Sequence, residues 1–403
     1  MTGPELRASA SLAGIFALRM LGLFLVLPVF ALEARNLPGG HDTAAVGLAM
    51  GIYGLTQGLL QIPFGMASDR FGRKRVIVLG LIVFAVGSFV AAGAQDLFWL
   101  TIGRAVQGAG AISAAVTALL ADQTRDGVRT KAMAVVGGSI ALMFALSLVL
   151  APVLTAHIGL GGLFALTGVL ATIGIAVVIW VTPPEPVNAH ALRPQGSLLE
   201  VLRNAQLQRL NVGVFVLHAV QLAMWVAIPA LLVQGGLPPA AHWQVYLPAV
   251  LASFGVMGAV LFPLERRGLL RAVFLASVGL IALVQLGLAW QSDTPSLPAL
   301  AVLLFLFFSG FNVLEASQPS MCSRIAPAHA RGAALGVYNT LQALGFFVGG
   351  AVGGWLIKSH GAQGLFVACT CAMLVWLAVA WPMRAPGVAT KPHDGAPADA
   401  QAR

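Results

Sequence analysis

Three ionisable side chains lie inside long apolar stretches of this sequence: Arg19, Arg104 and Glu315. An ionised group at the centre of a membrane helix costs roughly 2.5 to 3.5 kcal/mol on insertion scales, so each needs a partner, a cavity or a function. A carboxyl group such as Glu315 in that position is a candidate to take up and release protons. Asn312 lies one turn away on the same face, and Arg19 is a candidate countercharge. The structural alternative is that each group is held only by hydrogen bonds between helices.

The composition shows why these charges stand out. Of the 403 residues, 58% are apolar and 9% are charged, whereas charged residues make up about 25% of a soluble domain. We therefore expect an all-α polytopic membrane protein. Most basic residues fall in loops on one side of the expected spans, so the net charge of +9 reflects topology, with both termini cytoplasmic, and indicates no nucleic-acid partner.

Apolar stretches of about 20 residues define twelve expected transmembrane helices in two six-helix bundles. The first bundle covers residues 1–182 and the second covers 210–383, with a cytoplasmic linker over 183–209 and a disordered cytoplasmic tail over 384–403. Within the linker, residues 197–209 form either a short amphipathic helix or a plain connection. The expected spans are 11–32, 44–67, 76–94, 97–121, 132–155, 161–182, 210–234, 243–264, 272–290, 297–320, 333–357 and 362–382.

Short internal matches indicate that the two halves arose by duplication. Residues 66–75 (MASDRFGRKR) align with 262–271 (FPLERRGLLR), and residues 129–135 align with 331–337. Each match lies at a separation of about 200 residues, as expected for two pseudo-symmetric bundles.

A basic loop between the second and third expected spans carries the strongest local pattern. Basic residues cluster at 70–75, which places the loop on the cytoplasmic side. The pattern resembles the loop between helices 2 and 3 of the major facilitator superfamily of secondary transporters. The positions that carry this resemblance are Gly65, Asp69, Arg70, Gly72, Arg73 and Lys74.

A second pattern supports the same family. Residues 100–110, with Arg104, Gln107, Gly108 and Gly110, resemble the superfamily's motif in helix 4. The resemblance implies that Arg104 faces the central cavity and takes part in proton coupling. The segments GIYGLTQ at 51–57 and QIPFG at 61–65 are similar to the YajR-type branch of the family.

The resemblance also implies a gate on the cytoplasmic side. By analogy with the family, Asp69 meets the start of helix 11 near Gly332, and Arg73 pairs with Asp122 at the end of helix 4. An anion at a helix N-terminus is favourable, so the first contact is physically reasonable. The alternative is a loop of solvated charges.

Polar side chains elsewhere in the spans are candidates to line the cavity and contact the substrate. For each one alone, an interhelical hydrogen bond is the competing interpretation. These candidates are Gln57, Gln61, Gln107, His218, Gln221, Asn312, Asn339 and Gln342.

Together these features favour a monomeric secondary transporter of the bacterial inner membrane, with protons and a small molecule as its partners. We expect no cofactor and no metal. Glu315 and Arg104 favour proton coupling, and the resemblance to the family implies export of a small amphipathic or hydrophobic compound. Uptake or exchange of a sugar or other metabolite is the alternative, since helix 5 has Ala151-Pro152 where proton-driven exporters carry Gly-Pro. A non-transporting sensor or scaffold is the alternative of another class, and no catalytic motif indicates an enzyme.

Overall fold

The computed structural model describes residues 1–185 and 198–383, apart from a few side chains. Those side chains belong to Asp126, Gly127, Arg129, Thr130, Ala134 and Ala328. The predicted tail and residues 186–197 of the predicted linker therefore lie outside the described residues. Within the described ranges every regular element is a helix, which confirms the all-α prediction.

Each half of the chain contains a similar series of helices. The first half holds α1 (Gly3–Glu33), α2 (Thr43–Phe71), α3 (Arg73–Ala92), α4 (Leu97–Ala109), α5 (Ser113–Asp122) and α6 (Asp126–Ala176). The second half holds α7 (Leu198–Arg203), α8 (Ala205–Gln234), α9 (Trp243–Arg266), α10 (Leu270–Trp290), α11 (Leu297–Ile325) and α12 (Arg331–Ala380).

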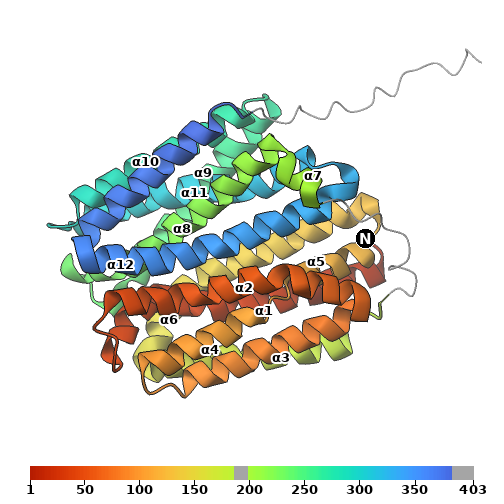
Figure 1. Cartoon of the computed structure of the whole chain (residues 1–403), viewed down its shortest axis with the longest axis horizontal. Helices are drawn as coiled ribbons and strands as arrows, with labels where there is room; N and C mark the ends of the chain where they lie inside the picture. The colour runs from red at the N-terminus through yellow and green to blue at the C-terminus, as the bar shows by residue number, and fades with distance from the viewer. Residues whose placement is uncertain (186–197, 384–403) are drawn as a thin grey trace, which may run out of the picture.

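Two of these helices are too long to cross a bilayer once. At 1.5 Å per residue, the 51 residues of α6 and the 50 residues of α12 would each extend more than twice the roughly 30 Å hydrocarbon core. Both are broken at a glycine with positive φ, Gly159 in α6 and Gly361 in α12. Figure 1 shows the two arms of α12 running in opposite directions. Counting both arms of each, the ten apolar helices are consistent with the twelve predicted spans.

The two halves lie side by side. In Figure 1 the first half, red to yellow, occupies the lower part of the view, and the second half, green to blue, occupies the upper part. The N-terminus and α7 lie at one end of the helices, on the right. We call this end, which also carries the 65–75 loop, the basic end, and the other the opposite end.

Side-chain caps explain where several helices begin. Asp42 accepts a hydrogen bond from the backbone N–H of Ala44, and Asp96 accepts one from that of Trp99. Asn204 caps α8, so that helix begins at Ala205, five residues before the predicted span. Helices extend past the apolar stretch because capping, rather than hydropathy, decides their ends.

The fourth predicted helix is interrupted. The sequence predicts one helix over 97–121, but the chain leaves helical geometry between Ala109 and Ser113, giving α4 and α5. Gly110 packs directly against α3, where a Cβ atom would lie 2.9 Å from Phe84 Cβ. The close approach of α3 accompanies the break.

Glycines with positive φ occur at equivalent positions in the two halves of the chain. All six such glycines in the described residues fall into three pairs: Gly39 and Gly236, Gly72 and Gly268, and Gly159 and Gly361. Members of each pair lie about 200 residues apart at equivalent turns, with φ of 63° and 71° in the last pair. The turns of the first half are therefore repeated in the second.

Candidate functional site

The polar interior of the first half is organised around Tyr53 on α2. Its hydroxyl accepts a hydrogen bond from Arg19 Nη2 at 2.8 Å, and its ring centroid lies 4.9 Å from the guanidinium carbon of Arg104. Both arginines are 1% exposed. Tyr53 thus joins α1, α2 and α4 through one hydrogen bond and one cation–π contact.

Arg19 also binds the interruption between α4 and α5. Its Nη1 donates to Ser113 Oγ at 3.1 Å, and its Nη2 donates to the carbonyl oxygen of Gly110 at 3.3 Å. A cation beside the C-terminal end of a helix is favourable, because the last carbonyls lack helical partners. Arg19 therefore stabilises the broken helix.

Arg104 belongs to a second hydrogen-bonded chain. Its Nη1 donates to Gln107 Oε1 at 2.8 Å, and Gln107 Nε2 donates to Ser88 Oγ on α3 at 2.8 Å. Its Nη2 donates to the Met50 carbonyl oxygen at 3.4 Å. The ion pairs formed among the described residues include neither Arg19 nor Arg104, and the Nε atom of each has no hydrogen-bond partner. The first half therefore holds two buried cations without a neighbouring acid.

The second half places Glu315 on α11 beside His218 on α8. Glu315 Oε2 lies 3.3 Å from His218 Nε2, and its Oε1 accepts a hydrogen bond from Gln342 Nε2 at 3.4 Å. Gln342 Nε2 also lies 2.7 Å from His218 Nε2. Three of the predicted residues thus form one cluster across α8, α11 and α12.

The contacts of His218 define how a proton can be held in this cluster. Its Nδ1 lies 2.8 Å from the Val214 carbonyl oxygen, which can only accept, so Nδ1 carries a hydrogen. In the neutral ring Nε2 then accepts from Gln342, and in the protonated ring Nε2 donates to Glu315. The Glu315 side chain is 39% exposed and that of His218 is 2% exposed, so the carboxyl group is the more accessible member of the pair.

The suggested pairing of Glu315 with Arg19 is wrong for this structure. The partners of Arg19 are Tyr53, Ser113 and Gly110, all in its own half. Glu315 instead has His218, from its own half, as its basic neighbour. Arg19 and Glu315 therefore each contact groups of their own half, whereas Asp42 of the first half pairs with Lys358 of the second, with 2.7 Å between Oδ2 and Nζ.

The other cavity candidates lie in separate environments. Asn312 Nδ2 donates to Ser253 Oγ on α9 at 2.7 Å. This hydrogen bond between helices is the competing interpretation given above for these candidates. Gln61 is 2% exposed and neither of its amide atoms has a partner. Gln221 is buried, and Gln57 and Asn339 are half-buried.

The basic loop contains the expected pair between Arg73 and Asp122. Arg73 Nε lies 3.3 Å from Asp122 Oδ2, and Arg73 also contacts Asp69 and donates to Ser68 Oγ at 2.6 Å. The side chains of Arg73 and Asp122 are 9% and 2% exposed. The pair therefore ties the start of α3 to the end of α5 away from solvent.

Glu185 supports this loop, a role that the sequence reasoning missed. Its carboxylate accepts hydrogen bonds from the backbone N–H groups of Arg73, at 3.0 Å, and Lys74, at 2.5 Å. These N–H groups lie at the start of α3, directly after Gly72, whose φ is +100°. An acid at a helix N-terminus is stabilising. The only sequence signal was an acid among the prolines at 183–186.

The expected contact between Asp69 and the start of α12 is not formed among the described residues. Asp69 pairs with Arg73 of its own loop, and its side chain is 55% exposed. At the start of α12, a Cβ atom on Gly332 or Gly336 would have no atom within 4 Å. The halves are therefore apart at the basic end.

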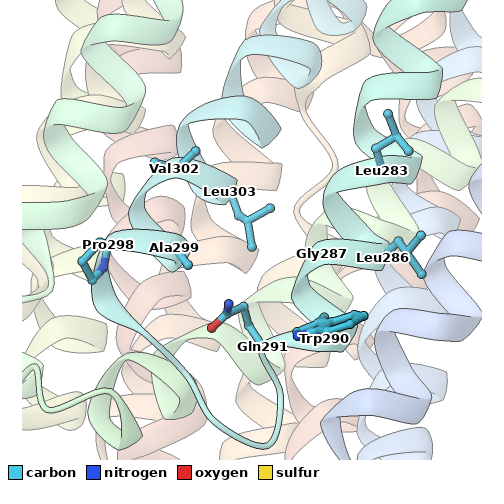
Figure 2. A pocket seen from close by; sticks show the side chains of 9 residues that line it. All are labelled: Leu283, Leu286, Gly287, Trp290, Gln291, Pro298, Ala299, Val302 and Leu303. Atoms are coloured by element: carbon cyan, nitrogen blue, oxygen red, sulfur yellow. The ribbon is translucent and has the colours of Figure 1, made fainter.

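A groove on the surface of the second half lies away from this chemistry. It has a volume of about 690 Å³ and lies between α10 and α11, as Figure 2 shows. Its lining includes Leu283 and Trp290, which are 67% and 84% exposed on apolar helices. These side chains face the surroundings of the bundle, so the groove is a lipid-facing surface rather than the transport site.

The fold and its polar interior define a class of protein. Two similar six-segment halves of apolar helices, with ionisable groups held inside the spans, form the architecture of a secondary transporter. The chain belongs to the major facilitator superfamily: the family model described as Major Facilitator Superfamily matches residues 12–350 and 264–402. The prediction of a transporter rather than an enzyme is therefore confirmed.

Relatives place the chain more closely within this family. It is 44% identical over 389 residues to the inner membrane transport protein YajR of Escherichia coli K12, covering 96% of this chain and 85% of that protein. It is 27% identical to the multidrug resistance protein MdtH of Aeromonas salmonicida, covering 86% of each. The crystal structure of the nucleoside transporter NupG has a TM-score of 0.76 at 13% identity, covering 93% of this chain and 99% of that one, which shows the shared fold. The chain is thus a multi-pass membrane transporter, similar to a protein of the inner membrane.

Proposed function

We propose that the protein exports small amphipathic or hydrophobic compounds in exchange for protons, acting as a monomer by alternating access. The observation that carries the proposal is the cluster of Glu315, His218 and Gln342. A carboxyl group and an imidazole 3.3 Å apart can share one proton, and the exposed carboxyl connects them to solvent. The name of the MdtH relative, a multidrug resistance protein, supports a drug-like substrate.

The two buried arginines have a complementary role in this proposal. Because Arg104 has no acid beside it among the described residues, its charge favours a nearby anion in any state that brings one closer. Deprotonated Glu315 is such an anion, and protonation removes it. We propose that this difference links proton binding to the movement of the halves.

The basic loop supplies the gate in this cycle. We propose that both termini and this loop are cytoplasmic, because the spans are flanked there by most of the basic residues. The structure is then open toward the cytoplasm. In the other state Asp69, now 55% exposed, reaches the start of α12 and closes that side.

The test uses purified protein in liposomes that contain a pH dye. A proton gradient is imposed, a panel of drugs, organic cations and sugars is added, and Glu315→Gln is compared with wild type. We expect at least one drug-like compound to dissipate the gradient at least about tenfold faster in wild type than in Glu315→Gln. Asp293→Asn, an exposed acid in the loop after α10, is the matched control and should behave as wild type.

A second measurement separates coupling from binding. Exchange of labelled compound across the membrane without a gradient needs the cavity but no net proton movement. Glu315→Gln should retain this exchange while losing gradient-driven transport. Gradient dissipation by Glu315→Gln at the wild-type rate would contradict the proposal, and a response to sugars alone would favour metabolite uptake.

A further inference from the structure

Another groove lies between α9 and α10, at the basic end of the second half. It has a volume of about 390 Å³. One wall is a single face of α9, with Val256, Val260 and Leu264 at intervals of four residues, and the other wall is α10 between residues 269 and 280. Both helices pack far more on α11, which forms the floor, than on each other. We call this space the α9–α10 groove.

The lining of the α9–α10 groove is almost entirely apolar. Its polar side chains are Ser277 on α10 and Ser309 on α11, and Ser309 Oγ donates to the carbonyl oxygen of Phe305 in its own helix at 2.8 Å. Ala272 and Ala276 lie at the rim and are exposed, so the groove opens toward the surroundings of the bundle. Along α9 it extends over eight residue steps, or about 12 Å. This shape suits a hydrocarbon chain rather than a polar ligand.

A charged turn closes the basic end of this groove. Leu264 is the last residue of α9 in the lining, and Arg266 and Arg267 follow it in the turn to α10. Both arginines are exposed, and neither side chain forms an ion pair or a hydrogen bond with another described residue. The acid of the same turn, Glu265, is paired with Arg324 at 3.1 Å. Two unpaired cations therefore lie directly beside an apolar groove.

The equivalent turn of the first half uses its cations differently. There Arg73 pairs with the nearly buried Asp122, and Lys74 Nζ donates to the Thr182 carbonyl oxygen at 2.9 Å. The alternative for the second turn is that its arginines only follow the excess of basic residues in cytoplasmic loops. That rule accounts for the charge, but it does not account for an apolar groove ending at the same turn.

We propose that the α9–α10 groove and its turn bind one acidic phospholipid, with an acyl chain in the groove and the phosphate at Arg266 and Arg267. In a bilayer, hydrocarbon chains fill a groove that opens toward the lipid, and a guanidinium group bonds phosphate through two parallel hydrogen bonds. The site holds whichever compound is transported. Its floor includes Val313 of α11, two residues before Glu315, so the site borders the helix that carries this carboxyl group.

Lipid binding can be measured on the purified full chain by native mass spectrometry in detergent, with phosphatidylglycerol or phosphatidylcholine of equal chain length added. Wild type should bind phosphatidylglycerol at least about fivefold more tightly than phosphatidylcholine. Arg266→Gln combined with Arg267→Gln should remove this preference and leave the affinity for phosphatidylcholine unchanged. The matched control is Arg75→Gln combined with Arg203→Gln, which removes two exposed arginines of α3 and α7 and should keep the preference.

The apolar part of the site is tested from the rim. Ala276→Phe places a ring in the groove from an exposed position and should weaken the binding of both lipids at least about threefold, because it takes the space of the acyl chain. Ala259→Phe, at an exposed position of α9 outside the lining, is its control and should change neither affinity. Glycerol phosphate, a soluble headgroup, should not displace the lipid even in large excess.

Several outcomes would overturn this site. An equal loss of preference in the two double arginine variants would mean that the lipid responds to overall surface charge. Displacement by glycerol phosphate together with unchanged binding to Ala276→Phe would leave an anion site without a lipid. A dimer in the spectrum that Ala276→Phe dissociates would assign the groove to a second copy of the chain. Because the arginine variants change only exposed side chains, they decide the proposal even if Ala276→Phe does not fold.

Discussion

The two halves of the molecule share their turns but differ in their chemistry. Three pairs of positive-φ glycines place equivalent turns about 200 residues apart. Yet the first half buries two arginines around Tyr53, whereas the second holds a carboxyl, an imidazole and an amide. The two halves share their backbone hinges but differ in their polar interiors, since the first contains two buried arginines and the second contains a carboxyl, an imidazole and an amide group.

The loops at the basic end differ in the same way. In the first half Arg73 of the loop pairs with Asp122, and both side chains are nearly buried. In the second half Glu265 pairs with Arg324 at 3.1 Å, with both side chains 35% exposed. The signs are reversed and the burial is lost, so the ion pair of the first loop is the one shielded from solvent.

The largest effect on transport is expected from substitution of Arg104, one of the two buried arginines of the first half. Arg104→Gln is expected to reduce gradient-driven transport at least about tenfold, measured in the liposome assay, because it removes the charge that favours an anion. Arg104→Lys should not restore it, since an ammonium cannot bond Gln107 and the Met50 carbonyl while stacking on Tyr53. Full rescue by lysine would show that only the charge matters.

Two matched truncations test the difference between the ion pairs of the two loops. Arg73→Ala removes a cation from the nearly buried Asp122 carboxylate and should lower the free energy of unfolding by roughly 3 to 5 kcal/mol. Arg324→Ala breaks an exposed pair and should cost about 0 to 1 kcal/mol. Unfolding in mixed detergent micelles measures both, and equal losses would contradict the difference in bracing.

Substitution of the two equivalent glycines, Gly159 and Gly361, should have equal and moderate effects on the free energy of unfolding. Gly159→Ala and Gly361→Ala force a side chain onto φ of 63° and 71° with ψ near 180°, which should cost about 1 to 3 kcal/mol each. Neither Cβ would have an atom within 4 Å, so the cost is conformational. Gly174→Ala, in an ordinary helical position, is the control and should cost nothing in the same unfolding measurement. Unequal losses of unfolding free energy at the two glycines would contradict the equivalence of the two turns.

The smallest effect is expected from a change of pH, which acts on the ion pair between Asp42 and Lys358. The hydrogen bond from Lys358 lowers the pKa of Asp42 below its usual value. A lowered pKa means that the contact is present above the ordinary carboxyl pKa, about 3.9, and is lost only as the pH falls through the lowered value. The maleimide labelling rate of a single cysteine introduced as Thr43→Cys, in a variant whose three native cysteines are replaced by serine, should therefore not change between pH 8 and pH 5. A rise within that range would mean that another group controls this end.

The sequence predicted what depends on local pattern. Apolar stretches located the spans, and the loop pattern identified Arg73 and Asp122, because hydropathy and helix-end charges are read within a few residues. The break at Gly110 was not predicted, since glycine in a membrane helix more often signals close packing. The partner of Glu315 was not predicted either, because the rotation of α8 against α11 is set by packing between distant segments. The predicted contact of Asp69 with the start of α12 is not formed among the described residues, because the separation of two distant segments is set by packing and not by local pattern.

The unneutralised arginines of the first half have an electrical consequence. A membrane potential acts on any charge fixed within the span, by about 2.3 kcal/mol for each elementary charge moved through 100 mV. A tilt of the first half that shifts Arg19 and Arg104 along the bilayer normal is therefore assisted or opposed by voltage. In the proposed cycle, the resting potential then biases which side of the protein is open before any compound or proton is bound.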